Sequence, residues 1–183
     1  MHRHLTAIVA IATTLIVGTV QAQQRPDLSG VWTRVDDSVS TARTVAATGD
    51  ASFRRGELGN GMGSPLTITQ STNQIVVEYP FFSTYDLQPP VRLSFSLDGS
   101  RSTNSVMLGH ESTELHSTAQ WSDSTLVLTI VYPGPAGADA RRLTTTVRHV
   151  IRPGAPGQIV VETTRSGGTF RGASPSRVTY NRR

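Results

Sequence analysis

Apolar and polar residues alternate with a period of two along most of the chain after residue 65. This alternation is typical of β-strands that bury one face, and the runs are rich in Val, Ile and Thr, which favour pleated strands. A first strand is expected at 29–35. The residues expected to face inward are Leu66 and Ile68; Ile75, Val77 and Tyr79; Val91, Leu93, Phe95 and Leu97; Leu126, Leu128, Ile130 and Tyr132; Leu143, Thr145, Val147, His149 and Ile151; Ile159 and Val161; and Val178 and Tyr180.

Short turns separate many of these runs. Asp98-Gly99 is the strongest hairpin signal, and turn residues also occur at 71–73, 122–124 and 153–157. Such links are too short for a helical crossover, so consecutive strands are expected to pair antiparallel. The pattern predicts an all-β fold: a single antiparallel up-and-down meander barrel of about 8–10 strands. A β-sandwich is the alternative.

One segment does not follow the alternation. Residues 37–58 offer little apolar face for a helix, and Gly56, Gly59, Gly61 and Gly63 would end one. We expect a long loop there, with at most one helical turn. Loops of this length often serve binding or cover a site.

The N-terminus predicts export. His2, Arg3 and His4 precede an apolar run over 5–20, and Val20-Gln21-Ala22 forms a small-x-small cleavage site. The run is shorter than the roughly 20 residues that span a bilayer. We therefore expect a signal peptide at 1–22 and one lipocalin-like β-barrel domain at 23–183, exported to the periplasm or the extracellular space, with no transmembrane segment after cleavage.

Composition adds two constraints. The chain has no cysteine, so no disulfide stabilises the domain, and all 17 basic residues are arginine. Residues 140–183 carry nine arginines and one acid, a net charge of +8, whereas residues 23–139 carry a net charge of −5. This asymmetry is compatible with an anionic envelope component as a partner, but solvated side chains on the outer strand faces are the simpler explanation. Interleaved exposed aromatics are absent from the basic third, so no nucleic-acid partner is expected.

The segment Leu28-Ser29-Gly30-Val31-Trp32 opens the first predicted strand. It resembles the Gly-x-Trp motif that opens the first strand of lipocalins and related calycin-type barrels. The resemblance implies that Trp32 plugs one barrel end and that an arginine on the last strand packs over it. Arg177 is the better-placed candidate for that arginine, and Arg182 is the alternative. The second lipocalin motif, Thr-Asp-Tyr, is absent.

Most of the mature chain also resembles small secreted bacterial proteins of uncharacterised function. Their shared pattern is matched at 26–32, 66–70, 97–99, 119–121 and 178–180. This resemblance implies a fold and assigns no activity.

Catalytic and metal-binding patterns are weak. His110, Glu114 and His116 share one parity, but His110 and His116 would lie about 20 Å apart on one strand, too far for a compact site. No Gly-x-Ser-x-Gly and no phosphate-binding loop is present. We therefore expect no catalytic residues, no metal and no cofactor.

The predicted interior suggests a ligand site instead. His149 shares the inward parity of Val147 and Ile151, so it could anchor a ligand, or simply be a satisfied core residue. The candidate ligand-binding residues are Trp32, Tyr79, Phe95, Trp121 and His149. Phe81, Phe82 and Tyr85 could border a barrel mouth or cap the core from outside.

Three functions are compatible with these observations. The first is an exported, non-catalytic binding protein for a small apolar or amphipathic ligand. The second is a structural or interaction module of the cell envelope. The third is a hydrolase or isomerase in the barrel mouth around His149.

Overall fold

A computed structural model describes residues 25–35, 62–80, 89–108, 111–134, 144–168 and 175–183. These ranges contain ten β-strands and no helix. They are β1 (Gly30–Arg34), β2 (Leu66–Gln70), β3 (Gln74–Tyr79), β4 (Val91–Ser96), β5 (Ser102–Leu108), β6 (Glu111–Ser122), β7 (Thr125–Tyr132), β8 (Thr145–Pro153), β9 (Gln158–Gly167) and β10 (Ser176–Arg182).

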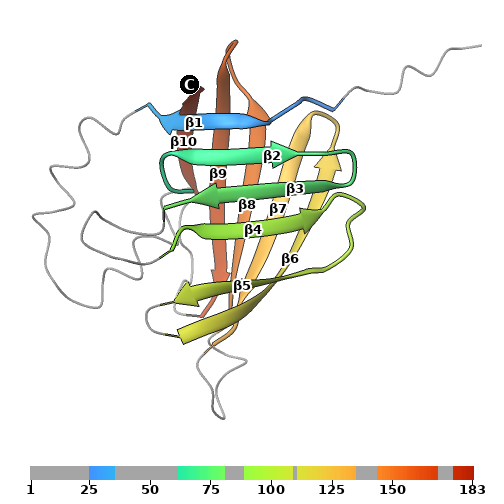
Figure 1. Cartoon of the computed structure of the whole chain (residues 1–183), viewed down its shortest axis with the longest axis vertical. Helices are drawn as coiled ribbons and strands as arrows, with labels where there is room; N and C mark the ends of the chain where they lie inside the picture. The colour runs from blue at the N-terminus through green and yellow to red at the C-terminus, as the bar shows by residue number, and fades with distance from the viewer. Residues whose placement is uncertain (1–24, 36–61, 81–88, 109–110, 135–143, 169–174) are drawn as a thin grey trace, which may run out of the picture.

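The strands form one antiparallel sheet in the order β4-β3-β2-β1-β10-β9-β8-β7-β6-β5. β1 pairs with β10, with Trp32 opposite Arg182, which joins the first strand to the last. In Figure 1, β1 to β4 lie across the view, in front of β7 to β10, which run up and down. The sheet thus curls into a nearly closed barrel that ends at β4 and β5. The predicted all-β, up-and-down antiparallel barrel is confirmed, with ten strands.

The alternation of apolar and polar residues in the sequence corresponds to side chains that face the inside and the outside of the barrel. On β7 the exposure alternates strictly, with Leu126, Leu128, Ile130 and Tyr132 buried. β4 buries Val91, Leu93 and Phe95 in the same way. Because side chains point to opposite faces at successive positions, the inward set of every strand contributes to one continuous core.

The two ends of the barrel differ in their connections. At one end, which we call the turn end, strands are joined by the short segments 71–73, 97–101, 123–124 and 154–157. Two of these turns contain a glycine at positive φ, Gly99 at 84° and Gly157 at 75°, as tight reversals require. At the other end, the connection end, are the strand termini that flank residues 35–65, 80–90, 109–110, 133–144 and 168–175.

Several predictions fall outside the described residues. These are the signal peptide at 1–22, the long loop at 37–58, the aromatic residues Phe81, Phe82 and Tyr85, His110, and the inward position of Leu143.

Candidate functional site

The turn end is closed by a plug built around Trp32. This side chain is 3 % exposed, and its indole N–H donates a hydrogen bond of 2.9 Å to the backbone carbonyl of Leu28. The guanidinium of Arg182 lies 4.9 Å from the centre of the Trp32 ring, a cation–π geometry. Arg182 also donates to the Ser29 carbonyl at 2.6 Å. Tryptophan and arginine together seal this end of the barrel.

Gly30 makes room for this arrangement. Its φ of +141° is one that L side chains rarely adopt, and a Cβ placed there would lie 3.3 Å from Nε of Arg182. The sequence ranked Arg177 above Arg182 as the arginine over Trp32, and that ranking is wrong. Arg177 is exposed and lies opposite Glu162 on β9, because it has the outward parity of β10.

The middle of the barrel holds a buried polar pair. Nδ1 of His149 lies 2.9 Å from the hydroxyl oxygen of Thr163, which sits opposite it on β9. The two side chains are 3 % and 2 % exposed. Burial lowers the pKa of His149 to about 4, and the positive charge of Arg165 acts in the same direction. His149 is therefore neutral at pH 7 and acts there as a hydrogen-bonding group.

Polar side chains gather further along, at the connection end. Tyr132 ends β7, Tyr79 ends β3 and Thr145 begins β8, all at inward-facing positions. Burial raises the pKa of the Tyr132 hydroxyl to about 12, and a hydrogen bond with the Tyr79 side chain opposes this shift. Three strands separate β3 from β7 along the shorter way around the wall. The tyrosine pair therefore spans the interior.

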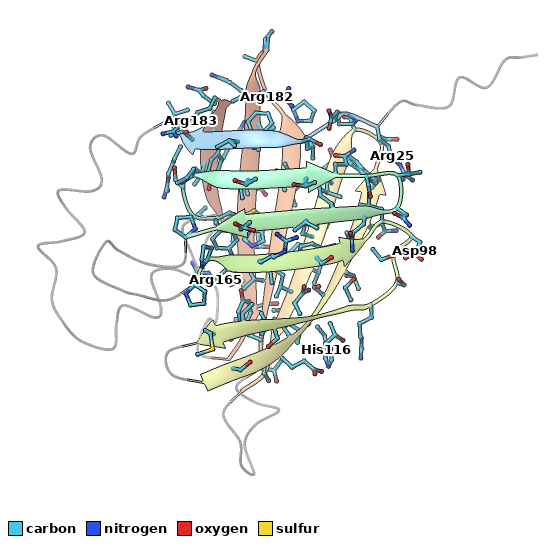
Figure 2. The ribbon with its side chains drawn as sticks, viewed as in Figure 1. Arg25, Asp98, His116, Arg165, Arg182 and Arg183 are labelled. Atoms are coloured by element: carbon cyan, nitrogen blue, oxygen red, sulfur yellow. The ribbon has the colours of Figure 1, made fainter. Side chains whose placement is uncertain are left out.

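Arg165 adds a charge to this end. It has the inward parity of Val161 and Thr163 on β9 and lies opposite Val147. Burial lowers the pKa of its guanidinium, although the side chain is only partly buried. Figure 2 shows Arg165 on the side of the connection end, with Asp98 and Arg25 on the opposite side.

Packing differs along the barrel axis. Leu93, Phe95 and Leu128 are 0 % exposed, so side chains fill the barrel around them. At the connection end, the inward-facing Val91, Val106, Tyr132 and Thr145 keep between 5 and 8 % of their surface exposed. These four partly exposed positions thus lie at the same end as Tyr79 and Arg165.

Not all of that end is accessible. Met62 is 1 % exposed and belongs to the core, and its carbonyl accepts a hydrogen bond from the Tyr180 hydroxyl. A Cβ on the neighbouring Gly63 would lie 2.6 Å from the Pro80 carbonyl oxygen, so this segment packs tightly against the end of β3. Residues 62–63 therefore cover the part of the connection end beside β10 and β3.

The structure separates the five predicted ligand-binding residues. Trp32 and Trp121 lie at the turn end, where the Trp121 indole nitrogen is buried without a hydrogen-bond partner in the described ranges. Phe95 is enclosed in the packed core. Tyr79 lies at the connection end, and His149 lies between the ends. Of the five, Tyr79 and His149 are closest to the polar groups.

Sequence reasoning passed over Tyr132, Thr163 and Arg165 as site residues. Parity was the available signal, since counting on from Ile159 and Val161 places Thr163 and Arg165 inside the barrel. No local pattern could show that Tyr132 meets Tyr79, because that contact joins strands far apart in the sequence.

The histidine and carboxylate of β6 remain on the outside. Nε2 of His116 lies 3.9 Å from Oε1 of Glu114, and both side chains are exposed or half-exposed. Within the described ranges, no group of three or more His, Asp or Glu side chains is arranged to hold a metal ion.

Comparison with known proteins does not extend this description. The sequence matches no family model and no curated protein. The part of the chain that the structure describes also contains no helix long and apolar enough to cross a membrane.

Proposed function

We propose that this protein is an exported, non-catalytic binding protein for a small amphipathic molecule. The ligand's polar group would contact Tyr79, Tyr132, Thr145 and Arg165 at the connection end, and its apolar part would pack against Val91 and Val106. The observation that carries this proposal is the polarity of the interior, which is apolar and sealed at the turn end and polar at the connection end.

The chemistry of this end suits such a ligand. Phenol and threonine hydroxyls and a guanidinium are hydrogen-bond donors that suit an oxygen-bearing group, and one phenol proton of the Tyr79–Tyr132 pair is already used within that pair. A site that combines apolar walls with a few converging polar groups is typical of small-molecule binding. Because the turn-end half is filled by side chains, a compact ligand fits this barrel better than a long acyl chain.

We further propose that the barrel is lipocalin-like and that the chain is exported. The Trp32–Arg182 stack at the turn end is the contact that the lipocalin resemblance implied, and it supports the first proposal. The basic start and the cleavage pattern at 1–22 support the second. N-terminal sequencing of the protein recovered from its own cells or medium should give Gln23 as the first residue.

Native mass spectrometry of the gently purified protein tests the binding proposal. We expect an additional mass that disappears on denaturation, or saturable binding of members of an amphipathic ligand panel. The variant Tyr132→Phe, which loses one hydroxyl, should weaken binding of such a ligand about tenfold.

Thr129→Val provides the matched control, because Thr129 faces outward on the same strand. The control should bind as the wild type does. Absence of any bound mass, together with no saturable binding across the panel, would contradict the proposal. Equal weakening by both variants would contradict the assigned site.

The outer face supports a second candidate function, attachment to an anionic envelope component. Val150, Glu162 and Arg177 lie side by side across β8, β9 and β10. Arg148 and Arg152 are exposed on β8, one on each side of this row. Arg152 lies 3.7 Å from Glu162. This group of residues therefore has three arginines, at 148, 152 and 177, and one carboxylate. A surface of this charge favours anionic partners.

Capture of partners from envelope fractions tests this candidate. At low ionic strength we expect retention that is lost at high salt and in the variant Arg148→Ser/Arg177→Ser. If no retained component depends on salt, this candidate function is wrong.

A further inference from the structure

The barrel wall has one seam, between β4 and β5. These two strands stand at opposite ends of the hydrogen-bonded order, although the curled sheet brings them next to each other. Within the described residues, the hydrogen bonds across this seam are made by side chains of β5, whereas the other nine junctions of the barrel are backbone ladders.

Asn104 is the main bridge across the seam. Its Oδ1 accepts from the Ser94 backbone N–H at 2.7 Å, and its Nδ2 donates to the Ser94 carbonyl at 3.0 Å. The second Nδ2 proton goes to the Ser117 hydroxyl on β6, at 2.8 Å. Asn104 is 6 % exposed. Its carboxamide therefore replaces a peptide group and ties β4 to both β5 and β6.

A second bridge lies one step nearer the turn end. The Ser96 backbone N–H donates to the Ser102 hydroxyl at 2.9 Å. The side chains of residues 102 and 104 on β5 thus accept hydrogen bonds from the N–H groups of residues 96 and 94 on β4. This two-residue step matches the spacing of N–H groups along one edge of a strand.

The next step in the same direction has no such bridge. Two residues further along each strand, the backbone N–H and C=O of Arg92 face the position of Val106. The side chain of Val106 has no hydrogen-bonding atom. Val106 and Val91, on the two sides of the seam, keep 6 % and 5 % of their surface exposed. Among the described residues, the seam is therefore held by side-chain hydrogen bonds on the turn-end side and has apolar side chains, without such bonds, towards the connection end.

We propose that the barrel wall opens locally at the β4/β5 seam, starting from the connection end, with Asn104 as the latch whose hydrogen bonds hold the seam closed and break when it opens. A boundary held by a few side-chain hydrogen bonds separates at a lower free energy than a continuous backbone ladder. The opening exposes the interior near Val91 and Val106 while the other nine junctions stay paired. This inference does not depend on the proposed ligand.

Hydrogen exchange of the full mature protein tests the opening without any substitution. The amides of Ser94 and Ser96 should exchange faster than that of Val161 in the β9 ladder. Their exchange should also depend only weakly on denaturant, because a local opening exposes little surface. Equal exchange free energies and equal denaturant dependence at all three amides would overturn the proposal.

Substitutions then test the latch. Asn104→Ala should raise exchange of the Ser94 amide about tenfold or more beyond any change at Val161. Ser102→Ala, a milder change, should raise exchange at Ser96 more than at Ser94. If Asn104→Ala does not fold, the Ser102→Ala variant and the wild-type measurement still decide the matter.

Ser105→Ala is the matched control on the same strand. The Ser105 hydroxyl lies outside the barrel, 2.7 Å from the Ser112 hydroxyl, and forms no hydrogen bond with the described residues of β4. The control should leave exchange at Ser94 unchanged. If the control and Asn104→Ala raise exchange at Ser94 equally, Asn104 is not the latch.

Discussion

At the scale of single residues, His149 is a titratable side chain that the fold keeps away from water. It is inward-facing, paired with Thr163 and held neutral by burial. A neutral imidazole has one donor and one acceptor, so one partner hydroxyl satisfies Nδ1 in either tautomer. A buried histidine of this kind makes folding depend on pH.

Stability should fall between pH 6.5 and about 4. The unfolded chain protonates His149 near its ordinary pKa of 6.5, whereas the folded chain does so only near 4. The folded state therefore binds fewer protons in this range, so its stability is complete above pH 6.5 and is lost as the pH falls. The loss is up to about 3 kcal/mol.

Denaturant unfolding of the wild type and of His149→Gln across pH 4 to 7 measures this effect. Carboxylate titration is common to both proteins, so the difference between them reports on His149. The wild type should lose more stability on acidification than the variant. Parallel pH profiles would show that His149 does not cause the loss.

At the scale of elements, β1 shows how a short strand can organise a barrel end. Its five residues pair with β2 on one side and β10 on the other. Gly30 lets the chain enter with positive φ, Trp32 fills the end, and Arg182 from β10 lies over the ring. Figure 2 shows Arg182 and Arg183 beside β1. The motif in β1 is complete only with its partner from the last strand.

The plug should show energetic coupling between Gly30 and Arg182. Gly30→Ala introduces a strained φ and crowds Nε of Arg182, and should cost about 1–3 kcal/mol. Arg182→Ala loses the ring contact and the hydrogen bond to Ser29, and should cost about 1–2 kcal/mol.

A double-mutant cycle measured by denaturant unfolding checks this coupling. The double variant should be less destabilised than the two single effects combined, because the crowding needs Arg182 to be present. Arg183→Ala, a neighbouring exposed arginine, should change stability by less than about 0.5 kcal/mol. Strict additivity would mean that Gly30 is required for its φ alone.

At the scale of the whole molecule, the barrel has a firmly closed end and a less tightly built one. The turn end has short turns and the Trp32–Arg182 plug. The connection end has the tyrosine pair, Arg165 and the unbridged part of the seam near Val106. Binding and opening are both proposed for the second end, whereas stability is expected to reside in the first.

Truncation in the packed half should be costly. Phe95→Ala removes a fully buried ring and should destabilise the protein by about 3–5 kcal/mol, which thermal or denaturant unfolding would measure. Met107→Ala, at a side chain that is 36 % exposed on the neighbouring strand, should cost less than about 1 kcal/mol. Similar losses in the two variants would mean that the turn-end half is not tightly packed.

The sequence by itself determined the local structure of this protein. Strict alternation predicted the strands and their inward faces, as on β4 and β7, and turn residues such as Asp98-Gly99 predicted antiparallel neighbours and hence a barrel. These features depend on residues close together in the chain, where periodicity and turn chemistry act directly.

Only the tertiary structure decided which inward side chains meet. The choice of Arg182 over Arg177, the Tyr79–Tyr132 contact and the Asn104 bridge each depend on strand register and on how far the sheet curls before it closes. Alternation places a residue inside the barrel, but it cannot specify the partner across the interior. That partner is set by the packing of all ten strands together.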